Sequence, residues 1–281
     1  MKRCMRGILA GGTALWLLIG FAACNTADAF VPGDYEVTDE AEESETQAVI
    51  SDSRFGTATA ASEKASSSPP VPTVRKLLEV PYLSQKGILP NGCEAVSATM
   101  LLHHLGYTIS PLEFVDRYLD IASTWKTGDT RYGPDPADAY AGNPKTDKGG
   151  FGCFSPVIIR ALKRALEEYA PGVYEVLDLG GLSLKELESY IDQGMPVAIW
   201  ATIGMAEVPF YYEWISPETG KTQRYPAREH CLVLVGYDDG LYYFNDPYNS
   251  NGLVSYRKAT VEKRYETLGR QAVAILSPAF P

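Results

Sequence analysis

The chain predicts an α+β fold, because its helix patterns come first and its strand patterns follow. Helix start signals stand at Ser110-Pro111, Ser155-Pro156 and Ser183-Leu184. After Gly194, runs rich in Val, Ile, Tyr and Phe indicate strands over 196–202, 230–237, 241–245 and 271–277. Helices followed by strands within one domain are typical of α+β proteins.

Residues 1–24 have the pattern of an export signal, with basic residues ahead of an uncharged apolar run. As a helix that run would span about 24 Å, less than the roughly 30 Å hydrocarbon core, so we expect cleavage. Phe21-Ala22-Ala23-Cys24 is similar to a bacterial lipobox, and lipidation of Cys24 would leave the protein on the extracellular face of the membrane. Cleavage after Ala27-Asp28-Ala29 would instead release it.

Two further segments follow the signal. Residues 25–72 are rich in Ala, Ser, Thr and Glu without an apolar period, which indicates a disordered acidic tether. Residues 73–281 suffice for one hydrophobic core, so we expect a single, monomeric domain. The chain has 35 acidic and 25 basic residues and no basic stripe, which argues against a nucleic-acid partner.

The helices of the domain can be bounded by their turn residues. Pro90-Asn91-Gly92 precedes a helix that begins at Cys93 and runs to Leu105, with Gly106 as its cap. Further helices are expected over 111–119, 155–170 and 183–194. The segment 123–152 has little periodicity and predicts a long loop, whereas 213–225 indicates an excursion or an extra hairpin.

Cys93 is the candidate nucleophile. A lone Cys in an apolar helix is usually a small buried hydrophobe. In the first turn, however, the positive end of the helix macrodipole favours the thiolate, so we expect a pKa below the free value of about 8.5.

His230 is the candidate base. The chain has three His residues, and His103 and His104 lie about 15 to 17 Å along the helix from Cys93, which is too far to reach its sulfur. The turn Asp238-Asp239-Gly240 predicts a hairpin whose open end holds His230.

The same hairpin supplies an orienting group for that imidazole. Asp246 would lie about 5 Å from His230 between Cβ atoms if the two were directly opposed, and it could serve as a turn residue as well. Asn245 faces the opposite side of the strand and is the fallback. Gln85 could donate to an oxyanion together with the Cys93 backbone N–H.

The cysteines allow two other interpretations. Cys93, Cys153, Cys231 and His230 could be metal ligands, but they lack the paired spacing of zinc sites, so no metal is expected. A Cys153–Cys231 disulfide stays open.

Several ordered blocks together resemble the papain-like cysteine peptidases, specifically the stand-alone, exported bacterial form of the peptidase C-thirty-nine-like family, which is related to bacteriocin-processing, double-glycine leader peptidases. The blocks lie within residues 77–277. They are Val80-Pro81-Tyr82-Leu83-Ser84-Gln85, Leu89-Pro90-Asn91-Gly92-Cys93-Glu94-Ala95, Gly152-Cys153-Phe154-Ser155-Pro156, Gly194-Met195-Pro196-Val197, His230-Cys231-Leu232-Val233-Leu234-Val235-Gly236-Tyr237 and Phe244-Asn245-Asp246-Pro247.

The resemblance implies a papain-like fold, with Cys93 as nucleophile, His230 as base, Asp246 as orienting acid and Gln85 in the oxyanion hole. It implies hydrolysis of peptide bonds in a peptide or protein substrate, without a cofactor. The chain lacks an exporter or ATPase region, so leader processing during transport is not carried over. Two alternatives remain: an amidase or transamidase that uses the same triad, and a non-catalytic surface module.

Overall fold

The computed structural model describes residues 76–278, so the expected signal and tether lie outside the described residues. Within this range, no helix is both long enough and apolar enough to span a bilayer.

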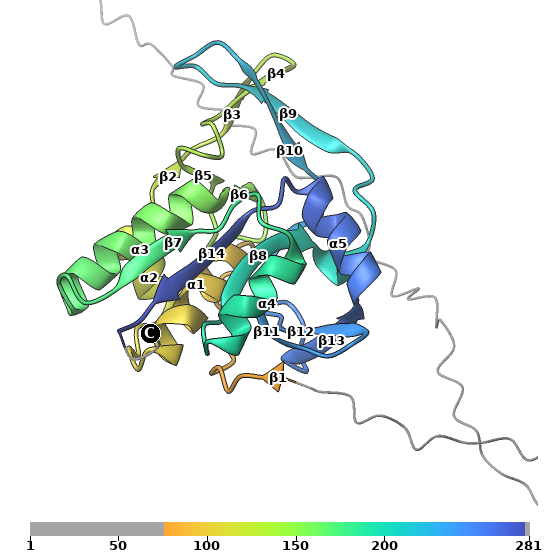
Figure 1. The fold of residues 1–281 in the computed structure, drawn as a ribbon. Helices are drawn as coiled ribbons and strands as arrows, with labels where there is room; N and C mark the ends of the chain where they lie inside the picture. The colour runs from red at the N-terminus through yellow and green to blue at the C-terminus, as the bar shows by residue number, and fades with distance from the viewer. Residues whose placement is uncertain (1–75, 279–281) are drawn as a thin grey trace, which may run out of the picture. The chain divides into compact units, whose positions relative to one another are not determined.

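A seven-stranded antiparallel sheet forms the centre of the domain (Figure 1). Its order is β13-β12-β11-β8-β14-β7, and the short β1 also pairs with β11. The strands are β1 (Lys76–Leu77), β7 (Glu175–Asp178), β8 (Val197–Thr202), β11 (Glu229–Tyr237), β12 (Leu241–Asn245), β13 (Leu253–Arg257) and β14 (Ala272–Leu276).

Helices cover both faces of this sheet, which confirms the predicted α+β class. They are α1 (Cys93–His104), α2 (Pro111–Tyr118), α3 (Ser155–Tyr169), α4 (Leu184–Asp192) and α5 (Lys258–Thr267), with a 3₁₀ turn at Ile203–Met205. Along β11, Cys231 and Val233 pack with the residues of α1, α2 and α3, whereas Leu232 and Leu234 pack with those of α4 and α5. Each apolar side chain buried in this way contributes about 1.5–3 kcal/mol.

The helix ends follow local sequence rules. The hydroxyl of Ser110 accepts a hydrogen bond from the N–H of Glu113, and Pro111 occupies the first helical position. Ser183 and Glu186 form a complete capping box at the start of α4. Because such caps need only neighbouring residues, the helix starts could be predicted closely.

The segment 123–152 differs from the expected loop. Its short strands join two small sheets, β10-β9-β4-β3 and β2-β5-β6. The strands within the segment are β3 (Trp125–Thr127), β4 (Thr130–Tyr132), β5 (Tyr140–Gly142) and β6 (Gly150–Gly152). The two sheets also contain β2 (Ile121–Ala122), β9 (Tyr211–Ile215) and β10 (Thr222–Pro226), which lie outside it. Strands of two or three residues are too short to show a period of two, so they escaped prediction.

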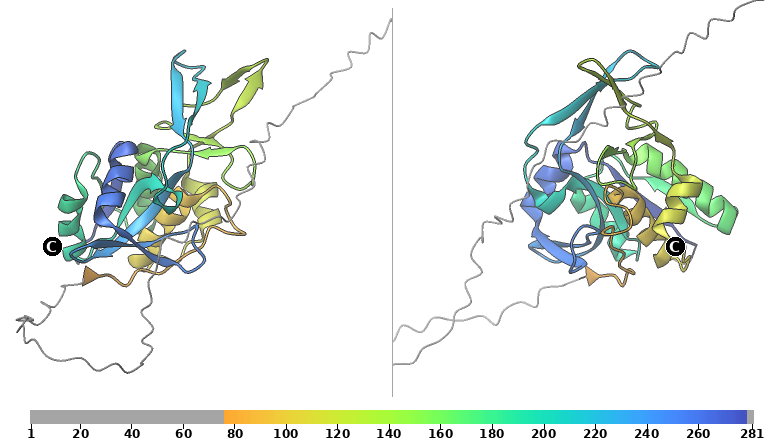
Figure 2. Two further views of the ribbon diagram at one scale, coloured as in Figure 1. Left: turned by 90° about the vertical axis from the view of Figure 1, so that its right-hand side faces the viewer. Right: turned by 180° about the vertical axis from the view of Figure 1, so that it is seen from behind.

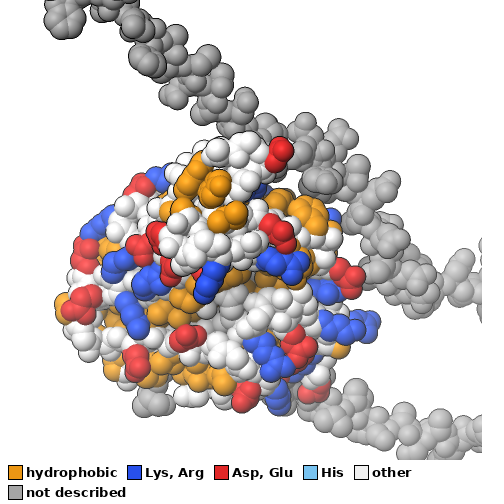
Figure 3. Space-filling view, turned by 90° about the horizontal axis from the view of Figure 1, so that it is seen from above, with side chains coloured by type: hydrophobic (Ala, Val, Ile, Leu, Met, Phe, Trp, Pro, Cys, Tyr) orange, Lys and Arg blue, Asp and Glu red, His pale blue; other side chains and the backbone are white. Residues whose placement is uncertain are grey.

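The hairpin suggested for 213–225 is confirmed, because β9 and β10 pair antiparallel. Together with β3 and β4 it extends beyond the end of the central sheet, as two views at right angles show (Figures 1 and 2). Seen from this end, hydrophobic side chains lie among charged ones (Figure 3). Three of the exposed rings here are those of Trp125 in β3, Tyr211 at the start of β9 and Phe210 just before β9.

Candidate active site

Cys93 is the first residue of α1, and a tight turn holds it there. The N–H of Gly92 donates to the carbonyl of Leu89 at 3.0 Å. A Cβ at Gly92 would stand 2.7 Å from the Leu89 Cβ, so only glycine permits this turn. The Cys93 sulfur accepts a 3.5 Å hydrogen bond from the N–H of Cys231, which places the start of α1 against β11.

A cavity of about 680 Å³ lies over this contact, and Gln85, Cys93 and His230 are among the residues that line it. They come from the segment before α1, from α1 and from β11, which are far apart in the sequence. The structure therefore brings three of the four predicted site residues to one cleft.

Asp246, the fourth, does not line the cavity but contacts the imidazole of His230. The Nε2 atom of His230 is 2.7 Å from Oδ1 of Asp246, and both side chains are almost fully buried. Burial alone would raise the pKa of Asp246, but the hydrogen bond and the charge of His230 outweigh it and hold that pKa below its usual value. The same Oδ1 accepts the N–H of Tyr248, so Asp246 also serves as the expected turn residue.

The direct opposition considered for this pair is wrong. The register places Asn245 opposite Val233, so Asp246 is diagonal to His230 across the ladder. A register shift between Leu234 and Gly236 accompanies this offset. The hydrogen bond forms because the side chains span the diagonal.

The other candidates for base and orienting group have structural partners. The Nδ2 of Asn245 donates to the carbonyl of Val80 at 2.8 Å, which anchors the segment before α1. His103 bonds the carbonyl of Ile109, and His104 bonds that of Gly194. None of these contacts involves the cleft.

Gln85 is 4 % exposed and is held by hydrogen bonds to Pro247 and Pro90. Its N–H donates to the carbonyl of Pro247, and its side-chain Nε2 donates to the carbonyl of Pro90 at 2.7 Å. An amide nitrogen carries two hydrogens, so one donor remains for a group in the cleft. Its Oε1 is buried without a partner.

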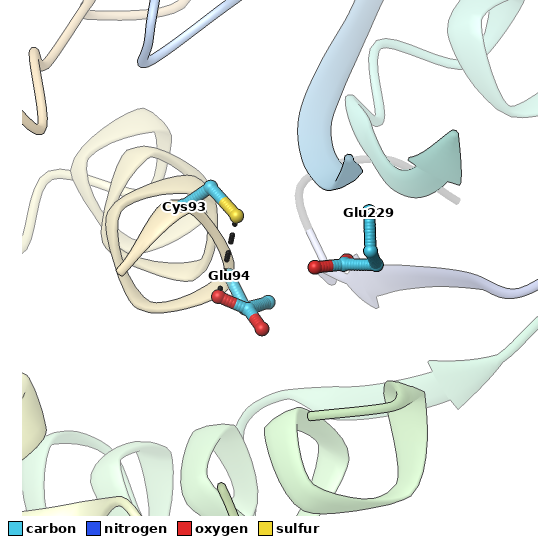
Figure 4. A group of neighbouring side chains, drawn as sticks. All are labelled: Cys93, Glu94 and Glu229. Atoms are coloured by element: carbon cyan, nitrogen blue, oxygen red, sulfur yellow. Dashed lines mark hydrogen bonds between the residues drawn. The ribbon is translucent and has the colours of Figure 1, made fainter. Parts of the chain in front are cut away.

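The expectation of a lowered thiol pKa is wrong for the structure as it stands. Burial raises the pKa of Cys93 well above its ordinary value, and the carboxyls of Glu94 and Glu229 raise it further. The thiol donates to Oε2 of Glu94 at 3.3 Å (Figure 4). The helix macrodipole is therefore outweighed by desolvation and by two nearby acids.

Glu94 and Glu229 were not predicted as site residues. Glu94 follows the nucleophile on α1 and accepts the N–H of Cys153 at 2.7 Å, whereas Glu229 precedes His230 on β11 and accepts the hydroxyl of Tyr225 at 2.8 Å. Burial raises the pKa of both carboxyls. The sequence feature that could have revealed them is an acidic residue at the start of a largely apolar helix, α1, and of a largely apolar strand, β11.

The three cysteines within residues 76–278 are free and buried. The Cys153–Cys231 disulfide that the sequence left open is thus not formed. Cys153 instead belongs to the core, where its carbonyl accepts the indole N–H of Trp200 at 2.9 Å.

Comparisons with known proteins agree with one another. The model of the Peptidase_C39 like family matches residues 77–273. The uncharacterized protein YvpB of Bacillus subtilis (strain 168) is 28 % identical over 187 residues, which cover 66 % of this chain and 70 % of YvpB.

A crystal structure from Bacillus anthracis, described as a candidate C39-like peptidase, superposes with a TM-score of 0.62. It is 24 % identical and covers 72 % of this chain and 98 % of that one, which shows that the fold is shared. Since the family model spans almost all of the described domain, the chain belongs to the peptidase C39-like family.

Proposed function

We propose that the chain is an exported cysteine peptidase that hydrolyses peptide bonds through Cys93, His230 and Asp246. The observation that carries the proposal is the buried His230–Asp246 pair at the cleft that Cys93 also lines. Membership of a peptidase-like family supports the same reaction class.

The hydrogen bond to Asp246 sets the role of each imidazole nitrogen. Because Nε2 of His230 is engaged by the carboxylate, Nδ1 is the nitrogen left to exchange a proton with the cleft. Asp246 accepts the Nε2 hydrogen and stabilises the imidazolium after the proton arrives. Hence Nδ1 acts as the base.

The reaction begins when the Cys93 thiol leaves Glu94 and gives its proton to His230. The thiolate attacks the carbonyl carbon, and the oxyanion accepts hydrogen bonds from the Cys93 N–H and from Nε2 of Gln85. His230 then protonates the departing amine. Water, deprotonated by the same imidazole, cleaves the thioester and restores the thiol.

A peptide-library digest tests this function. The wild-type chain is expected to generate new N-termini that are absent from Cys93→Ala and from His230→Gln. His103→Gln serves as the matched histidine control, because His103 bonds a backbone carbonyl outside the cleft. Cleavage that persists in Cys93→Ala, or no cleavage by the wild type, contradicts the proposal.

The location outside the cytoplasm is part of the proposal and is supported by the signal pattern of residues 1–24 and by the lipobox-like segment at Cys24. Metabolic labelling with a radioactive fatty acid tests the attachment. Label that the wild type incorporates and Cys24→Ala does not is expected. Equal labelling of both, or none, contradicts lipidation.

A further inference from the structure

A thiol and two carboxyls meet beneath the cleft. Ligand atoms of Cys93, Glu94 and Glu229 all lie within 4.8 Å of one another, and all three residues are buried. The side chains come from the start of α1 and the start of β11 and point toward one another (Figure 4). The cluster connects with the outside, because Cys93 and Glu229 both line the cavity.

One of the two carboxyls, that of Glu229, has an oxygen without a hydrogen-bond partner. Within residues 76–278, neither carboxyl forms an ion pair with Lys or Arg. Glu94 accepts hydrogen bonds from the Cys93 thiol, from the N–H of Cys153 and from its own backbone N–H, whereas Glu229 accepts one from the hydroxyl of Tyr225. The Oε1 atom of Glu229 is buried and has no partner, and the whole residue is only 8 % exposed. A buried carboxyl without a partner takes up a proton, whereas a buried carboxylate that stays charged is paired with a cation or bound to a metal. A cation in this cluster would replace the protons that burial otherwise retains on the two acids.

The spacing suits a small, borderline-soft cation. A tetrahedral zinc ion with Zn–S near 2.3 Å and Zn–O near 2.1 Å sets its sulfur and oxygen ligands about 3.6 Å apart. Sγ of Cys93 and Oε2 of Glu94 are already 3.3 Å apart. The thiolate favours zinc and its neighbours over calcium and magnesium, which prefer oxygen alone.

We propose that Cys93, Glu94 and Glu229 bind one zinc-like divalent cation and that the bound ion blocks the nucleophile. The metal displaces the thiol proton, which passes to water, and takes the sulfur lone pair that would attack a substrate carbonyl. The loaded form is therefore inactive, and loss of the ion with return of a proton from water restores the thiol. His230 is not a ligand, because its ring nitrogens lie outside this compact group. The binding of the ion is independent of the peptidase function, whereas the block of the nucleophile rests on that proposed function.

Titration of the reduced full chain with Co²⁺, a spectroscopic substitute for Zn²⁺, tests the site. We expect one ion per chain with a sulfur-to-cobalt charge-transfer band that Zn²⁺ abolishes. Glu94→Gln and Glu229→Gln should each weaken binding at least about tenfold, since an amide oxygen is a poorer ligand than a carboxylate. Cys93→Ala should lose the band.

Three variants serve as controls. Cys231→Ala keeps the band if the sulfur is that of Cys93, and Glu213→Gln removes an exposed acid without effect. His230→Ala, which is inactive under the proposed function, should bind Co²⁺ as the wild type does. Thermal unfolding with and without Zn²⁺ gives a second measure, because binding to the folded state raises Tm.

The failures of the two proposals can be told apart. Absence of binding to the wild type, or affinities unchanged in both Glu variants, overturns the metal site whatever the peptidase activity. Loss of binding in His230→Ala also overturns it, because the metal would then lie between Cys93 and His230. If one Glu variant does not fold, the other carries the test.

Discussion

The carboxylate of Asp246 lies 2.7 Å from Nε2 of His230, and this pair joins β11 to the segment that follows β12. The contact occupies Nε2, and under the proposed function Nδ1 is the nitrogen that exchanges the proton. The orientation of the imidazole therefore depends on one buried carboxylate.

Asp246→Asn tests that dependence. The substitution keeps the size of the side chain but removes the charge that stabilises the imidazolium, so kcat should fall about a hundredfold or more. KM should change little, because Asp246 does not line the cleft. Steady-state kinetics on a peptide identified in the library digest measures both. An equal kcat in wild type and Asp246→Asn contradicts the orienting role.

Gln85→Ala should lower kcat by about a hundredfold to a thousandfold, since a donor to the developing oxyanion is worth about 2.7–4 kcal/mol. The matched control is Gln193→Ala, whose exposed side chain bonds only the carbonyl of Ser189. The far-UV circular dichroism spectrum checks that the variant folds. If Gln85→Ala raises KM and leaves kcat unchanged, Gln85 only binds the substrate.

Glu229→Gln should make the Cys93 thiol more reactive. Burial, Glu94 and Glu229 raise the thiol pKa, so in the wild type the thiolate forms only at high pH. Removal of one negative charge lowers that pKa, and each unit corresponds to about a tenfold larger thiolate fraction on the acid side of the titration.

The rate of iodoacetamide labelling at Cys93 between pH 6 and 10, followed by peptide mass spectrometry, measures the change. The profile of Glu229→Gln should shift toward lower pH, and that of Glu213→Gln should not. Rapid wild-type labelling near pH 6 would show that the thiol is already ionised and would contradict the structure.

Gly152→Ala should displace Glu94 and Tyr225, the hydrogen-bond partner of Glu229. A Cβ at this residue would stand 1.9 Å from the Tyr225 hydroxyl and 2.6 Å from Oε1 of Glu94, and φ is +142°. We expect a loss of about 3 kcal/mol or more in the free energy of unfolding. Gly149→Ala also has a positive φ but meets nothing within 4 Å, so it should cost only about 1–2 kcal/mol. Urea unfolding compares them, and equal losses contradict the steric account.

The sequence predicted best what local chemistry determines. Ser110 and Ser183 mark helix starts because their hydroxyls bond a backbone N–H three residues on. His230 and Asp246 could be chosen because the chain offers few histidines and one hairpin holds both.

What escaped prediction depends on contacts between distant segments. The single bridge between Tyr132 of β4 and Ile215 of β9 joins residues more than eighty positions apart. The thiol pKa was misjudged for the same reason: the helix macrodipole is local, whereas Glu229 reaches Cys93 from β11. Neither the contact between β4 and β9 nor the one between Glu229 and Cys93 produces a periodic pattern in the sequence.

The central claim is that Cys93 forms a thioester with the acyl part of a peptide. Digestion of the peptide library in the presence of hydroxylamine tests it, because the amine competes with water for the thioester and leaves a C-terminal hydroxamate on the fragment. We predict hydroxamate-terminated fragments with the wild-type chain and none with Cys93→Ala. Fragments that carry only carboxylates at saturating hydroxylamine, or hydroxamates that persist in Cys93→Ala, would contradict the account.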